Sequence, residues 1–181
     1  MSEAMQRGHQ ERLGPMAAEV LDTGMVRPRD LTHLGVTLGP GSFTGLRVGL
    51  SFAKGLATGL GLPLQGIGTL EALGHHPDLL GKNRLAVIDG GRGQIYVQAF
   101  DGDTVGQPRA VTAEDDIHTD ILTGPGAHLL PGRGEVFEQK WPSLDALVAL
   151  TLAGGHDDLT PLYMREADAV ASTRGIITLS A

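Results

Sequence analysis

The most distinctive stretch of the sequence is Gly39-Pro40-Gly41-Ser42-Phe43-Thr44-Gly45-Leu46-Arg47. The apolar run His33–Leu38 before it predicts a strand, and the residues after it predict a helix to Leu60 with Ser42 or Thr44 as its N-cap. Glycines at a strand-to-helix turn expose backbone N–H groups where anions bind favourably. They equally allow a tight turn that packs the helix closely on the sheet. From the residues alone both interpretations stay open.

The sequence lacks the residue patterns of several enzyme classes. No Gly-Lys-Ser/Thr follows the turn at Walker A spacing, and its third glycine comes one residue late for a dinucleotide fingerprint. The chain has no cysteine, no Gly-x-Ser-x-Gly elbow and no His-x-x-x-His pair. His75-His76 reads as a loop, and the acidic run from Glu114 to Asp120 reads as a surface segment. We therefore predict no catalytic residue and no metal site.

The helix after the glycine turn is apolar on two sides. A surface helix needs a single apolar stripe, so this helix is either sandwiched within its own domain or shared with a partner. The first stripe comprises Leu46, Leu50, Ala53, Ala57 and Leu60, and the second comprises Val48, Phe52, Leu56 and Gly59.

The remaining segments alternate between helix and strand patterns, which predicts an α/β chain with a mixed sheet. An amphipathic helix is expected over residues 10–23, and Thr69 is expected to cap a short helix. Further expected elements are strands at 62–67 and 120–123, a hairpin of strands at 84–89 and 94–101, and a helix at 143–152. A boundary between Leu80 and Arg84 divides the chain into units 1–82 and 83–181.

Composition excludes other classes of function. The 181 residues include 14 basic and 21 acidic side chains, for a net charge of −7, and aromatic residues are 4%. An acidic chain with few aromatics is a poor unaided binder of nucleic acid. No apolar run is long enough for a membrane span, and the first residues do not form a signal peptide. We expect a cytoplasmic chain with no membrane partner.

Several motifs together resemble the TsaB (YeaZ) family. The glycine stretch is followed by Gly49-Leu50 and Ala53–Ala57, which are similar to the residues that follow this motif in the family. Ile88-Asp89, Arg92-Gly93 and Tyr96 are similar to its Ile-Asp-Ala-Arg-x-Gly-x-Val-Tyr hairpin. Further similar segments are residues 9–13 with Pro15-Met16, residues 63–67, residues 69–73, and the closing Pro161-Leu162-Tyr163-Met164-Arg165.

The resemblance implies an actin-like, ribonuclease-H-type fold of the ASKHA class, with mixed sheets, flanking helices and two lobes at 1–82 and 83–181. It implies a non-catalytic scaffold that binds TsaD, the subunit that transfers threonylcarbamoyl to adenosine 37 of tRNA. TsaE would join through TsaD, tRNA would be contacted only indirectly, and the chain could pair with itself. No cofactor is implied, and ATP would bind only at a partner interface. The alternatives are a glycoprotease-like metallopeptidase and an ATP-binding enzyme acting alone.

The resemblance also gives the second apolar stripe a use, because the family places its first two helices in a four-helix bundle with itself or with TsaD. It implies a partner interface formed by Leu13, Met16, Val20, Val48, Phe52 and Leu56.

One feature of the family has no counterpart in these residues. Family members begin with a strand such as Ile-Leu-Ala-Ile-Asp-Thr-Ser and a second strand, about 30 residues in all. The resemblance therefore predicts an incomplete N-terminal lobe whose sheet has an open apolar seam. It also predicts that the Asp loop, which faces a nucleotide in this fold class, is absent.

Overall fold

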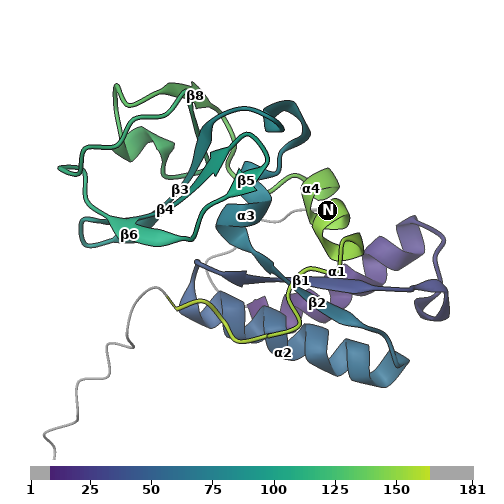
Figure 1. Ribbon diagram of the computed structural model, residues 1–181. Helices are drawn as coiled ribbons and strands as arrows, with labels where there is room; N and C mark the ends of the chain where they lie inside the picture. Colours follow the sequence, from purple (N-terminus) through teal and green to yellow (C-terminus); the bar gives the residue numbers. More distant parts are fainter. Residues whose placement is uncertain (1–8, 164–181) are drawn as a thin grey trace, which may run out of the picture.

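The computed structural model describes residues 9–163, which form two sheets with flanking helices (Figure 1). The first sheet pairs β1 (Leu34–Gly39) in parallel with β2 (Leu64–Gly68). The second has the strand order β5-β4-β3-β7-β8, with β6 also pairing β4. Its strands are β3 (Arg84–Gly91), β4 (Gln94–Asp101), β5 (Thr104–Val105), β6 (Arg109–Val111), β7 (Ile121–Thr123) and β8 (Glu135–Phe137). Parallel and antiparallel pairs coexist, so the predicted mixed α/β class is confirmed.

Four α-helices are described: α1 (His9–Thr23), α2 (Phe43–Leu60), α3 (Thr69–Gly74) and α4 (Leu144–Leu152). Three short 3-10 turns accompany them at Pro28–Asp30, Pro77–Leu79 and Ala127–Leu129. A parallel pair of strands must be covered on both faces, because both faces are apolar. In Figure 1, α2 lies along one face of β1 and β2, and α4 lies on the other.

The ends of α2 follow from its sequence. The Ser42 hydroxyl accepts a hydrogen bond from the Gly45 N–H at 3.3 Å, so of the two predicted N-cap candidates it is Ser42, and not Thr44, that caps the helix. At the other end Gly61 adopts a left-handed φ of 65°, which a glycine reaches without steric cost. Leu46, Leu50 and Ala57 of the first apolar stripe are buried.

The second sheet is built on the predicted hairpin. Its turn residues Arg92 and Gly93 have φ angles of 53° and 82°, as a two-residue hairpin turn requires. β3 lies between β4 and β7, and its Val87 is fully buried. One buried cluster on this sheet comprises Leu85, Val87, Ile95, Val97, Val111, Ile117, Leu122, Ala127 and Leu130. A second cluster joins α3 to the sheet through Leu70, Leu73, Ala86, Tyr96 and Phe100.

The start of α3 differs from the prediction. Its N-cap is Gly68 rather than Thr69, which is the first helical residue. The Glu71 carboxylate, at the third helical position, accepts a hydrogen bond from the Gly68 N–H at 3.4 Å. The acidic side chain three residues inside the helix therefore satisfies the orphan donor, and a hydroxyl at position 69 is not needed.

The chain returns to the first sheet after the second is complete. α4 packs on β1, β2 and α3. Gly66 of β2 then pairs with His156 through backbone hydrogen bonds of 2.9 and 2.8 Å, and the Leu162 N–H donates to the Leu38 carbonyl at 2.7 Å. Residues 144–163 thus contact elements before residue 82, and the division into units 1–82 and 83–181 stays a prediction. Met164 and Arg165 of the closing motif lie outside the described residues.

None of the helices within residues 9–163 is long and apolar enough to cross a membrane.

Substitution by alanine at two helical glycines should change the free energy of unfolding in opposite directions. A Cβ at the buried Gly74 would lie 2.2 Å from the Phe100 ring, so Gly74→Ala should lower the free energy of unfolding by about 1–3 kcal/mol. Gly59 in α2 is exposed with nothing near its Cβ position, so Gly59→Ala should raise that free energy by about 0.5–1 kcal/mol. Denaturant unfolding of both variants measures the contrast, and similar effects at the two positions would contradict it.

Candidate functional site

The glycine turn joins β1 to α2 with almost no free space at its first residue. Gly39 has a φ of 108°, and a Cβ there would lie 2.9 Å from the Leu46 Cδ1 and 3.0 Å from the Leu162 carbonyl oxygen. Gly39 and Pro40 are both buried. These contacts agree with a tight packing turn, while the anion-binding alternative stays a hypothesis.

Most of the remaining motif residues face solvent, although Leu46 is buried. Phe43 is 47% exposed, and its ring lies 5.0 Å from that of Tyr163. The Arg47 guanidinium lies over the Phe43 ring at 5.3 Å. Gly41, Ser42 and Thr44 are also exposed. This end of α2 therefore presents an aromatic ring and a cation side by side at the surface.

A groove of about 490 Å³, here called the helix-pair groove, lies beside this exposed end between α1 and α2. The helices approach closely, since a Cβ at Gly14 would lie 3.9 Å from the Phe52 ring. The lining residues combine apolar side chains with polar ones. They are Leu13, Phe43, Thr44, Arg47, Val48, Ser51 and Phe52.

The structure brings together only part of the predicted interface set. Leu13, Val48 and Phe52 line the helix-pair groove, each half-buried. Met16 is half-buried on α1 and Val20 is 48% exposed, and neither lines that groove. Leu56 lines another groove along the edge of β1, to which Leu13 and Phe52 also contribute. The assignment of all six to a partner interface stays a prediction.

Sequence reasoning missed a side-chain hydrogen bond at the carboxyl ends of the first two strands. The His156 Nε2 lies 2.9 Å from the Glu71 carboxylate, which also caps α3. The pair lines a cleft of about 420 Å³ that includes Gly39, Gly68 and Gln98. Residues 85 apart have no shared local pattern, and the only sequence signal was the acidic third position of α3.

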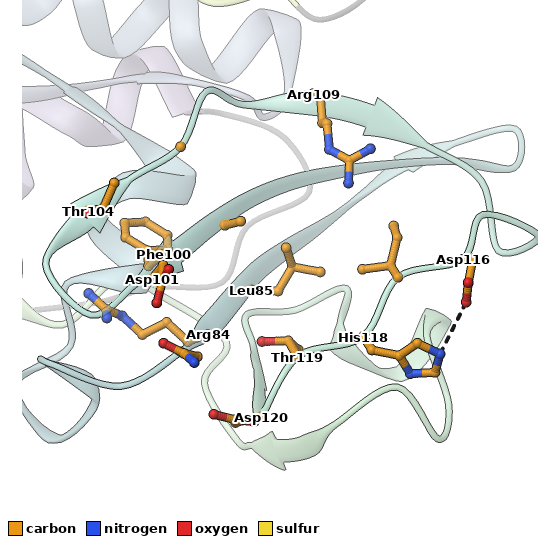
Figure 2. Close-up of a pocket in the computed structure, with 14 residues that line it drawn as sticks. Arg84, Leu85, Phe100, Asp101, Thr104, Arg109, Asp116, His118, Thr119 and Asp120 are labelled. Carbon is orange, nitrogen blue, oxygen red and sulfur yellow. Dashed lines mark ion pairs between the residues drawn. The ribbon is translucent and has the colours of Figure 1, made fainter.

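A further hollow of about 620 Å³ lies on the second sheet (Figure 2). Asp116 pairs there with the His118 Nε2 at 3.1 Å and with the Arg133 guanidinium at 3.3 Å. Arg84 donates to the carbonyls of Gly74, Lys82 and Gly102, and burial lowers the pKa of its guanidinium. The Arg84 guanidinium is thus used to bind backbone carbonyl groups. The acidic run from Glu114 to Asp120 lies at the surface, as predicted.

Within residues 9–163, no group of three or more His, Asp or Glu side chains is placed to hold a metal ion.

Comparison with known proteins identifies the chain's relatives. The family model described as TsaD, tRNA N6-adenosine threonylcarbamoyltransferase, matches residues 2–127. The tRNA threonylcarbamoyladenosine biosynthesis protein TsaB of Escherichia coli K12 is 31% identical over 169 residues, covering 86% of this chain and 72% of that protein. An uncharacterized protein of Mycobacterium tuberculosis H37Rv is 34% identical over 170 residues, covering 90% of this chain and 78% of that protein.

A solved structure confirms the fold. The crystal structure of an uncharacterized Pseudomonas aeruginosa protein with similarity to peptidase YeaZ superposes with a TM-score of 0.75 at 23% identity. The match covers 90% of this chain and 87% of that one. The expected actin-like α/β architecture is therefore confirmed, and together with the sequence relatives the comparison shows that this chain belongs to the TsaB (YeaZ) family.

Proposed function

We propose that this chain is a non-catalytic scaffold subunit that binds TsaD and supports threonylcarbamoylation of adenosine 37 in tRNA. Family membership supports a role in tRNA threonylcarbamoyladenosine biosynthesis. The finer part, a binding rather than a chemical role, rests on the helix-pair groove.

The observation that carries the proposal is the unequal burial of the two apolar stripes of α2. Leu46, Leu50 and Ala57 are buried against the chain's own sheet. Val48 and Phe52, on the other stripe, remain half-buried although α1 packs beside them. An apolar helix face that its own domain covers incompletely is suited to a partner helix.

The end of the groove near the start of α2 has the chemistry of a protein interface. Protein interfaces are enriched in aromatic residues and arginine relative to the rest of the protein surface. Phe43 and Arg47 supply these types at one end, beside the apolar Leu13, Val48 and Phe52. The glycine motif and the helix pair would thus form one continuous contact surface for TsaD.

The proposal extends to the other partners of the chain. The groove would also serve a second copy of this chain, in competition with TsaD. TsaE would be recruited through the TsaD complex, and tRNA would be contacted only indirectly, in keeping with the net charge of −7. We place this assembly in the cytoplasm and assign the lobes to residues 1–82 and 83–181.

An aspartate at Val48 should disrupt TsaD binding. Val48 lines the helix-pair groove alone, whereas Phe52 also lines the groove along β1. Val48→Asp would bury an unpaired charge at the interface, so we expect the dissociation constant for TsaD to rise at least about tenfold. Calorimetric titration against TsaD measures it, with circular dichroism as the check on folding.

Thr58→Asp is the matched control, because it adds the same charge to an exposed position of α2 outside the groove. It should bind TsaD like the unaltered chain. Arg47→Ala removes an exposed rim side chain without touching the core, and it should weaken binding even if Val48→Asp fails to fold. Unchanged affinity in both Val48→Asp and Arg47→Ala would refute the proposed interface.

The role itself is tested by omission from a reconstituted reaction. Threonylcarbamoylation of tRNA would be measured with TsaC, TsaD, TsaE, ATP, threonine and bicarbonate, with and without this chain. We expect modification to depend on the chain and to fall with Val48→Asp but not with Thr58→Asp. Equal modification with and without the chain would contradict the scaffold role.

A further inference from the structure

Arg47 brings a charge to the helix-pair groove. Among the described residues that line this groove, it alone is charged. Its side chain is exposed, and its guanidinium lies 5.3 Å from the centre of the Phe43 ring. No carboxylate within residues 9–163 forms an ion pair with it. A cation therefore lies beside apolar side chains without a counter-charge from the described part of its own chain.

The other Lys and Arg side chains of α1 and α2 each have an acidic neighbour. Arg12 of α1 donates hydrogen bonds of 2.9 and 3.0 Å to the Glu19 carboxylate. Lys54 of α2 acts on Asp158: hydrogen bonds from Thr160 lower the pKa of the Asp158 carboxyl, and the charge of Lys54 lowers it further. Within these two helices, the arginine in the groove is thus the cation left for a carboxylate of another molecule.

Two neighbouring aromatic rings restrain this guanidinium. The Phe43 ring beneath it lies 5.0 Å from the ring of Tyr163. The Leu162 N–H donates to the Leu38 carbonyl at 2.7 Å, which anchors the end of the described chain beside the start of α2 (Figure 1). A side chain that is already restrained loses less conformational entropy when it forms an ion pair. The arrangement therefore favours pairing at this position.

A carboxylate on a protein helix fits the groove better than a phosphate of tRNA. Nucleic acid is bound by several cations acting together, and the described lining offers one. The groove also presents Leu13, Val48 and Phe52, which require apolar side chains of the partner. A guanidinium binds a carboxylate through two parallel hydrogen bonds. An amphipathic helix with an acidic residue at the edge of its apolar face satisfies both requirements.

A second copy of this chain does not supply the carboxylate from the same surface. In a twofold pair the same patch of each copy faces the other. The described residues that line the groove include no Asp or Glu, so a second copy would add a second cation and no anion. The counter-charge is therefore expected on a different protein.

We infer that Arg47 pairs with an aspartate or glutamate on the helix of TsaD that packs in the helix-pair groove, and that this ion pair selects the partner. The inference rests on the proposed binding to TsaD.

The salt dependence of TsaD binding by Arg47→Met tests the ion pair. Methionine keeps an unbranched apolar side chain and removes the charge. The dissociation constant should rise at least about fivefold at about 50 mM salt, and less than about twofold at about 500 mM, where the pair is screened. An equal loss at both salt concentrations would mean that Arg47 acts through packing, and it overturns the inference.

Lys54→Met is the matched control. It removes a positive charge from an exposed position of the same helix outside the groove, so it should bind TsaD like the unaltered chain at both salt concentrations. The same salt-dependent loss in Lys54→Met and Arg47→Met would show an effect of net charge rather than of a specific pair, and it also overturns the inference.

Charge reversal tests the partner's side of the pair. Arg47→Glu should bind TsaD at least about tenfold more weakly, because it places one carboxylate opposite another. Exposed acidic residues of TsaD would then be replaced one at a time by arginine. One such replacement should restore binding to Arg47→Glu and weaken binding to the unaltered chain, and rescue at no position overturns the inference.

Val48→Asp separates this inference from the proposed function. Unchanged TsaD affinity in Val48→Asp, Arg47→Met and Arg47→Glu would remove TsaD from the groove and overturn both. Weakened binding by Val48→Asp with unchanged binding by Arg47→Met overturns the ion pair alone. A salt-sensitive loss confined to self-association of the chain, or to tRNA binding by the complex, would place the counter-charge there and would equally overturn the inference.

Discussion

The parallel pairing of β1 with β2 is the constraint on which the rest of the structure depends. Both faces of such a pair must be buried, and a two-stranded sheet cannot bury them itself. One face is covered by α2, which follows β1 directly in the chain. The other face is covered by α4, which follows the whole second sheet in the sequence. The pairing of His156 with Gly66 then fixes this return at the edge of β2. The segment that follows the second sheet is thereby held against the first sheet.

Local chemistry made much of this predictable. A hydroxyl before a long apolar run predicts that α2 starts at Ser42 or Thr44, because a helix N-terminus needs an acceptor for its free N–H groups, and the structure selects Ser42. Gly93 after Arg92 identifies the hairpin, since the turn requires positive φ. The failure at Thr69 has the same physics: two side chains could serve the N-terminus of α3, and Glu71 does so.

What the sequence could not predict depends on which distant segments meet. The periodicity of α1 places Leu13 and Val20 on one stripe, yet Leu13 lines the groove beside α2 while Val20 lies largely exposed. An apolar stripe reports that burial is favourable and not which neighbour provides it. The contact between Glu71 and His156 could not be predicted from local sequence for the same reason, because 85 residues separate the two side chains. The assignment of six particular residues of the first two helices to an interface therefore stays a prediction.

The two apolar grooves are not independent of each other. Leu13 and Phe52 line both, so α2 has the helix-pair groove on one flank and the groove along the edge of β1 on the other. Any segment bound in the groove along β1 would contact Phe52 and restrict its rotamers. That restriction would lower the entropy lost when a partner binds in the helix-pair groove. Val48 belongs to the first groove and Leu56 to the second, and this separation allows each effect to be measured without the other.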